Sequence, residues 1–233
     1  MDLLLLPGMD GTGRLFGRLL EELPDTVRPE VVTYPTDEEL GYDELQPRIT
    51  ARAPEAPYVV LGESFSGPLA LRHAASRPAG LRGVILSATF ARNPAPWGTA
   101  PLLAWMGPVP FRARPPRLVV RGLLTGFDAS DAVVDDAITV AGLVEPRVWS
   151  HRLREVFAVD VREELPAIDV PVLYLLGTRD RIVGRRGLRS LRKGLAHLHV
   201  VELDAPHQVL QTRPAQACRA IVEFLQRELG GTD

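Results

Sequence analysis

The chain has 233 residues, of which 45% are hydrophobic, and its formal net charge at pH 7 is −2. This length and composition suit one domain with a sizeable core. The small net charge argues against a global field that would recruit nucleic acid or an anionic membrane. The apolar run at residues 3–6 is far too short for a signal peptide or a membrane span, so we expect a cytoplasmic protein.

Short apolar runs alternate with helical patterns over the first 90 residues. Such alternation predicts a mostly parallel sheet with helices on both faces. A glycine-rich loop at residues 7–13 follows the first run. The expected strands cover residues 3–6, 30–34, 58–62 and 81–87, and the expected helices cover residues 16–23, 42–53 and 65–76.

The alternation stops between residues 91 and 168, where all three tryptophans of the chain fall. We expect a helical lid in this segment, with a short strand at 118–120 and helices at 102–106, 132–141 and 146–157. The inner face of such a lid would form an apolar pocket, and Trp97, Trp105 and Met106 are the candidate substrate contacts. The alternative is an excursion that packs a small core of its own.

Strands and helices alternate again after residue 168, so residues 1–90 and 169–233 are predicted to form one core. Strands are expected at 170–177 and 197–203, and helices at 188–195 and 214–229. The last helix carries an apolar face, and its Cys218 is interpreted as a buried thiol. The arginine-rich segment 179–193 is interpreted as a solvated helix face, with docking of an acidic partner as the alternative.

The stretch 58–67 has the pattern of a nucleophile elbow, a sharp strand-to-helix turn that exposes one serine. Ser64 would be that serine. Gly62 and Gly67 would let the strand and the helix pass close to each other, and Ser66 stands where the usual G-x-S-x-G pattern has its second glycine. The simpler alternative is a small-residue turn before an ordinary helix.

Two further side chains follow predicted strands in the order that a Ser-Asp-His triad needs. His207 would accept the proton of Ser64 as general base, and Asp180 would orient and stabilise the imidazole. The carboxyl ends of parallel strands share one edge of the sheet, so the three residues should meet there. His73, His197 and His199 are interpreted as structural, and His151 as a minor candidate for substrate contact.

An ester-cleaving serine also needs two N–H groups that bind the oxyanion. The N–H of Phe65 follows the nucleophile, and the N–H of Met9 lies in the glycine-rich loop; both are predicted donors. This loop lacks the spacing and the Lys-Ser/Thr pair of nucleotide-binding loops, which argues against nucleotide binding.

The segments Leu-Pro-Gly-Met-Asp-Gly-Thr-Gly, Gly-Glu-Ser-Phe-Ser-Gly, Gly-Thr-Arg-Asp and Ala-Pro-His together resemble the α/β-hydrolase superfamily. Within it, the chain is similar to small bacterial serine hydrolases and to the hydrolase-like part of plant phytyl ester synthases. The resemblance implies an α/β-hydrolase fold with a helical lid inserted after the fourth strand, and no cofactor or metal. It also implies a sheet trimmed to about six strands.

These observations favour a carboxylesterase that acts on apolar esters through an acyl-Ser64 intermediate. An acyltransferase or a thioesterase would use the same intermediate, and its partner would likewise be a small ester or thioester. A third hypothesis is a ligand-binding protein on a hydrolase fold with little or no turnover.

Overall fold

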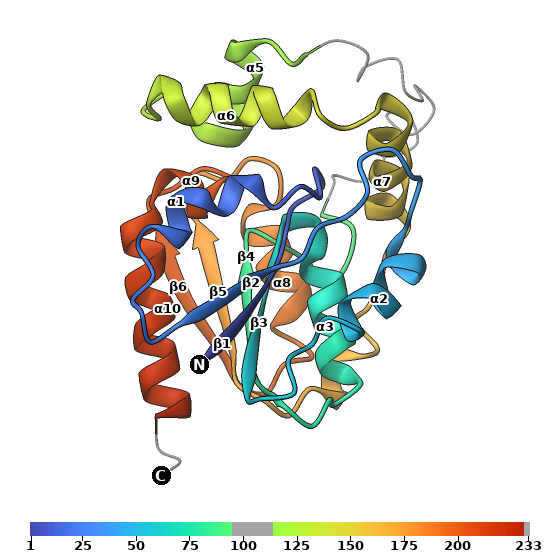
Figure 1. Ribbon diagram of the computed structural model, residues 1–233, viewed down its shortest axis with the longest axis vertical. Helices are drawn as coiled ribbons and strands as arrows, with labels where there is room; N and C mark the ends of the chain where they lie inside the picture. Colours follow the sequence, from blue (N-terminus) through green and yellow to red (C-terminus); the bar gives the residue numbers. More distant parts are fainter. Residues whose placement is uncertain (95–113, 231–233) are drawn as a thin grey trace.

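A parallel sheet of six strands forms the centre of the part of the chain that the computed structural model describes, residues 1–94 and 114–230 (Figure 1). The strand order is β2-β1-β3-β4-β5-β6, and every neighbouring pair is parallel. This confirms the predicted sheet. The strands are β1 (Asp2–Leu6), β2 (Arg28–Val31), β3 (Tyr58–Glu63), β4 (Leu81–Ser87), β5 (Val172–Gly177) and β6 (Leu198–Leu203).

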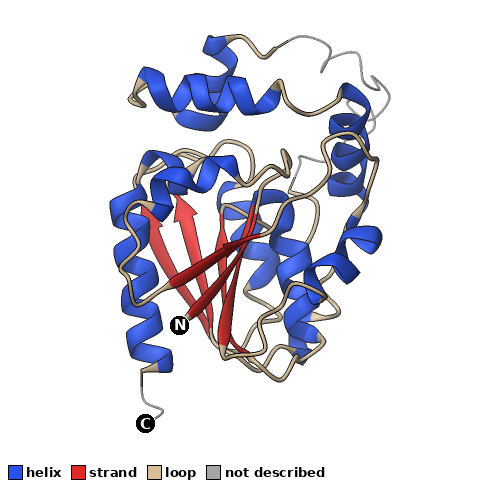
Figure 2. Cartoon of the chain, in the orientation of Figure 1, coloured by secondary structure: helices blue, strands red, loops and turns tan. Residues whose placement is uncertain are grey.

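Helices cover both faces of the sheet (Figure 2). Side chains alternate along each strand, so Leu4 and Leu6 enter one apolar cluster while Leu3 and Leu5 enter the other. The first cluster is covered by α2 (Tyr42–Thr50), α3 (Gly67–Ala75) and α8 (Gly184–Leu191). The second is covered by α1 (Gly17–Leu20), α9 (Val209–Thr212) and α10 (Pro214–Leu229).

Several element boundaries differ from the expected ones. Strand β2 begins at Arg28 rather than at residue 30 and includes Pro29, which an edge strand tolerates because one side needs no ladder donor. Two 3₁₀ turns, η1 (Arg14–Phe16) and η2 (Ser64–Ser66), precede the short α1 and α3. Helix α8 runs from Gly184 to Leu191 rather than from 188 to 195. Its Gly187 packs closely, since a Cβ there would lie 2.1 Å from the Thr89 carbonyl oxygen.

The segment between β4 and β5 contains α5 (Arg117–Val120), a π-helical turn η4 (Arg121–Thr125), α6 (Asp131–Ala141), α7 (Pro146–Ala158) and a 3₁₀ turn η5 (Leu165–Ala167). Helices α5 and α6 lie beyond the arrowheads of the strands (Figure 1). The division of the chain into core and lid stays a prediction.

The predicted strand at 118–120 is wrong, because these residues form α5. Its Val120 packs on Val134 and Ala137 of α6, so local packing overrides the β preference of a Leu-Val-Val run. The expected helix 102–106 and the candidate contacts Trp97, Trp105 and Met106 fall outside the described residues. Within residues 1–94 and 114–230, no helix combines the length and apolar character that a membrane crossing requires.

Candidate active site

Ser64 lies directly after β3 in a sharp turn that leads into α3. Its φ of 48° is in the left-handed region, which is costly for a residue with a side chain. Small neighbours make the turn possible: a Cβ on Gly62 would lie 2.7 Å from the Ser66 carbonyl oxygen, and one on Gly67 only 1.9 Å from Thr89 Oγ1. The Thr89 hydroxyl also donates a hydrogen bond to the Ser64 carbonyl. The geometry is that of a strained strand-to-helix elbow.

The structure brings the three predicted triad residues together. The distance between Ser64 Oγ and His207 Nε2 is 2.9 Å, and the distance between His207 Nδ1 and Asp180 Oδ2 is 3.0 Å. The second carboxylate oxygen of Asp180 accepts hydrogen bonds from the N–H groups of Ile182 at 2.8 Å and Val183 at 3.1 Å. The loop after β5 therefore fixes the carboxylate, the carboxylate fixes the imidazole, and the imidazole faces the hydroxyl.

The charges around these three residues favour an ionised Asp180 and a His207 that accepts a proton. Burial raises the pKa of Asp180, but the charge and hydrogen bond of His207 outweigh it, so this pKa lies below its ordinary value. Burial lowers the pKa of His207, yet Asp180 and then Glu63 raise it above its ordinary value. An ionised carboxylate thus stabilises the imidazolium that forms when His207 accepts a proton.

The two predicted oxyanion donors lie on the elements expected for them. Phe65 lies in η2, directly before α3, and Met9 lies in the loop after β1. Among the described residues, no acceptor takes the N–H of Met9. A buried or half-buried N–H without a partner is uncommon in folded proteins and is a feature of oxyanion sites.

Sequence reasoning missed a buried carboxyl group beside the triad. Glu63 ends β3 immediately before Ser64, is 6% exposed, and accepts a hydrogen bond from Gln211 Nε2 at 2.9 Å. Burial raises its pKa to about 7, although the Gln211 hydrogen bond opposes the rise. Only the charged residue at the end of an otherwise apolar run could have drawn attention to it.

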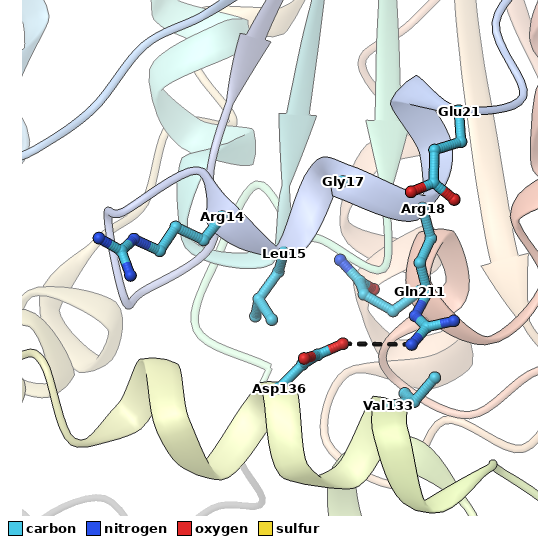
Figure 3. Close-up of a pocket in the computed structure, with 8 residues that line it drawn as sticks. All are labelled: Arg14, Leu15, Gly17, Arg18, Glu21, Val133, Asp136 and Gln211. Carbon is cyan, nitrogen blue, oxygen red and sulfur yellow. Dashed lines mark hydrogen bonds and ion pairs between the residues drawn. The ribbon is translucent and has the colours of Figure 1, made fainter.

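A cavity of about 230 Å³ opens between η1, α1 and α6 (Figure 3). Arg18 of α1 spans it to Asp136 of α6 with a 3.2 Å ion pair. Gln211 also lines the cavity, so the cavity reaches the side chain that contacts Glu63. Its lining mixes charged and apolar side chains: Arg14, Leu15, Gly17, Arg18, Glu21, Val133, Asp136 and Gln211.

Two of the remaining histidines, His73 and His199, make contacts away from this group of residues. His73 is buried and shares a 2.6 Å hydrogen bond with the Tyr58 hydroxyl, while His199 lies 3.3 Å from Glu228 and 3.0 Å from Arg227. The cysteine is buried, as expected, with its sulfur 3.0 Å from the Glu22 carbonyl oxygen.

Carboxylates of the same chain pair with part of the arginine-rich segment 179–193. Arg179 contacts Asp128 at 2.9 Å and Asp204 at 2.7 Å, and Arg185 contacts Glu202 at 2.7 Å. These ion pairs favour a solvated structural surface over a free basic patch.

Comparison with known structures shows the same fold in several enzymes. A bromoperoxidase from Bacillus anthracis matches with a TM-score of 0.83 at 15% identity, over 97% of this chain and 91% of that chain. A thermophilic esterase from Thermogutta terrifontis matches with a TM-score of 0.80 at 20% identity, over 97% and 90%. The enol-lactonase from Burkholderia xenovorans LB400 matches with a TM-score of 0.73 at 20% identity, over 96% and 90%. No curated protein matches the chain in sequence.

The parallel sheet and a family model that covers more than half of the chain together define the protein as an α/β-hydrolase. A family model described as "Hydrolase_4: Serine aminopeptidase, S33" matches residues 42–205, which include the elbow and the loop with Asp180. The chain belongs to this family of hydrolytic enzymes.

Proposed function

We propose that the protein is a serine carboxylesterase whose nucleophile is Ser64. The observation that carries the proposal is the continuous contact from Ser64 Oγ through the His207 ring to the Asp180 carboxylate, at 2.9 and 3.0 Å. Hydrogen-bond contact between a hydroxyl and an oriented base is what activates a serine near neutral pH. The names of two structural neighbours, an esterase and an enol-lactonase, describe enzymes of the same reaction type.

The proposed reaction has two halves. Ser64 Oγ attacks the ester carbonyl carbon while its proton moves to His207 Nε2, and the N–H groups of Met9 and Phe65 bind the oxyanion. The carbon–oxygen bond to the alcohol then breaks, and the alcohol leaves with the proton from His207. Water, deprotonated by His207, cleaves the acyl-Ser64 ester in the same manner and releases the acid.

We further propose that the substrate places an apolar group beneath the segment 91–168. The support is the sequence of this segment, which holds all three tryptophans, with Trp97, Trp105 and Met106 as the expected contacts. An apolar pocket with few polar groups is the common form of small-molecule sites. We also propose a cytoplasmic location, for which the sequence is the only support.

The test is hydrolysis of a p-nitrophenyl ester series of increasing acyl length by wild-type protein and by Ser64→Ala. We expect the substitution to lower kcat by a factor on the order of 10⁶, as in other triads. Ser76→Ala is the matched control and should keep full activity. The hydroxyl that it removes lies at the far end of α3 and donates to the His73 carbonyl. Normal turnover by Ser64→Ala would disprove the proposal.

The same panel separates the alternatives. Ester product formed with an added alcohol would indicate an acyltransferase, and preference for a thioester would indicate a thioesterase. Hydrolysis of an aminoacyl p-nitroanilide would indicate the peptidase activity for which the family is named. Ligand binding without turnover and without labelling by a fluorophosphonate would indicate a binding protein.

A further inference from the structure

We propose that Ser66 and Arg152 are positioning residues of the oxyanion hole, because together they fix the peptide that carries the Met9 N–H. Ser66 belongs to the elbow, and Arg152 belongs to α7 in the segment between β4 and β5. The inference rests on the proposed function, since the oxyanion in question forms when Ser64 attacks a carbonyl group.

The Ser66 and Tyr34 hydroxyl groups, both buried, hold the Pro7 carbonyl. This is the first carbonyl of the loop 7–13, which carries the Met9 N–H. The Ser66 hydroxyl donates a short hydrogen bond to the Pro7 carbonyl, and the Tyr34 hydroxyl lies 2.7 Å from Ser66 Oγ. Because serine has one hydroxyl proton and directs it at Pro7, the proton between the two hydroxyls belongs to Tyr34. Burial raises the pKa of Tyr34, so it remains a donor over the working range of pH. A glycine at position 66 could not form this chain.

Arg152 holds the third carbonyl of the same loop. Its guanidinium donates to the Met9 carbonyl at 2.8 Å and to the Pro35 carbonyl at 2.7 Å, and it lies 5.7 Å from the centroid of the Tyr34 ring. The side chain is fully buried, and within the described residues no carboxylate lies within 4.0 Å of it. The charge of the buried Asp10 offsets part of the desolvation of Arg152, but a buried cation whose hydrogen bonds within the described part of the chain go to carbonyls is still costly to fold, which favours a specific role for it.

The Gly8 carbonyl, which lies between those of Pro7 and Met9, is bound by a donor of the loop itself. The Gly11 N–H donates to the Gly8 carbonyl at 3.0 Å. Gly11 has φ 73°, and a Cβ there would lie 2.8 Å from both Arg152 Nη1 and Tyr34 Cβ, so glycine permits the close approach. Three successive carbonyl groups are thus bound by donors from the elbow, the loop and α7.

This arrangement sets the direction of the Met9 N–H. The Gly8–Met9 peptide is trans, so its N–H points opposite to its C=O. The Gly8 C=O faces the Gly11 N–H, and the Met9 N–H therefore points away from the loop. Ser66 and Arg152 hold the carbonyls of the two flanking peptides, which fixes the ends of the Gly8–Met9 peptide, and the Gly11 hydrogen bond opposes its turning between those ends. An oxyanion donor acts through orientation fixed before the reaction, which these contacts supply.

The test uses Ser66→Ala and Arg152→Lys, with Ser87→Ala as the matched control. Ser87 is a fully buried serine at the end of the neighbouring strand β4, and its hydroxyl has no hydrogen-bond partner among the described residues. The measurements are kcat, KM and pH profile for the preferred ester, and the inhibition constant of a matching trifluoromethyl ketone, whose adduct carries the oxyanion. Melting temperatures establish that each variant is folded.

We expect Ser66→Ala to lower kcat roughly 10- to 100-fold, short of the loss of a whole oxyanion donor, with KM within about twofold. The ketone should weaken by a similar factor, while the acid limb of the pH profile stays in place because His207 is untouched. Arg152→Lys should behave alike, since an ammonium cannot bridge two carbonyls as a planar guanidinium does. Ser87→Ala should match wild type.

Three outcomes decide the question. Wild-type kcat and ketone affinity in both folded variants would overturn the positioning role and leave the proposed esterase intact. Absence of Ser64-dependent turnover in wild type would overturn the proposed function and this inference with it. If Arg152→Lys fails to fold, Ser66→Ala decides alone, because it removes only the hydroxyl that binds the Pro7 carbonyl.

Discussion

Gln211 Nε2 donates a hydrogen bond to Glu63 Oε1 at 2.9 Å, directly behind the strand end that carries Ser64. Gln211 belongs to α9, the first helix after His207, so this contact connects the segments that hold two members of the proposed triad. Both side chains are nearly fully buried. At pH values where Glu63 is ionised, a negative charge is therefore enclosed beside the proposed active site.

The first prediction concerns stability. Burial raises the pKa of Glu63 from 4.5 to about 7, so the folded state binds this proton more tightly than the unfolded state. The resulting stabilisation is complete below pH 4.5 and is lost as pH rises through about 7, a change of roughly 3 kcal/mol from this group alone. Glu63→Gln cannot ionise. In urea titrations, the free energy of unfolding of Glu63→Gln should therefore increase relative to that of wild type as the pH is raised from 5 to 8.

Glu163→Gln provides the control for this measurement, because Glu163 is exposed. Its stability should run parallel to that of wild type over the same range. If the curves of Glu63→Gln and wild type were also parallel, Glu63 would not titrate differently in the folded state.

The second prediction concerns the pH dependence of kcat/KM. His207 must be neutral to accept the Ser64 proton, and Asp180 and Glu63 raise its pKa above 6.5 in spite of burial. Activity should therefore fall as pH drops through a value above 6.5. Glu63→Gln removes one of the raising charges, so its acid limb should move to lower pH. An acid limb at the same pH in both proteins would show that Glu63 does not act on His207.

The third prediction concerns the contact between the segment before α6 and the core. Asp128 accepts from Arg179 at 2.9 Å and from Arg213 at 2.5 Å, and Arg179 is the neighbour of Asp180. The carboxylate is 44% exposed, so Asp128→Asn should change global stability by less than about 1 kcal/mol. It should nevertheless speed amide hydrogen exchange in the loop 178–183.

Asp131→Asn is the control. It also disrupts two arginine contacts, but both partners, Arg117 and Arg121, lie outside the core, so it should leave that loop unchanged.

The parts of the fold that local patterns determine were predictable. The apolar runs predict all six strands, because a buried parallel strand reads as a continuous apolar stretch. Their ends lie within two residues of the observed ones, except that β2 ends at Val31, three residues before the predicted end. Ser64, Asp180 and His207 were found together because each lies within four residues after the end of such a run. The run at 118–120 shows the limit of this reasoning: without a sheet edge to join, Val120 packs as part of a helix.

The partners of the site were not predictable in the same way. Arg152 looks like any charged residue of an amphipathic helix, and only the tertiary structure places it against the Met9 and Pro35 carbonyls. The same holds for Gln211, whose partner Glu63 is far from it in sequence. Contacts of this kind depend on how distant segments pack, and no periodicity in the chain records them.

The last prediction tests the steric basis of the elbow with two glycines that each begin a helix. A Cβ at Gly67 would lie 1.9 Å from Thr89 Oγ1, whereas a Cβ at Gly17 would meet nothing within 4 Å. Gly67→Ala must displace Thr89, which also donates to the Ser64 carbonyl, and should cost about 1–3 kcal/mol of stability with a drop in kcat. Gly17→Ala should be neutral or stabilise by up to about 1 kcal/mol, because alanine restricts the unfolded chain. Urea unfolding and ester turnover of the two variants measure both effects, and equal stability in the two would mean that α3 and the Thr89 loop do not approach as closely as described.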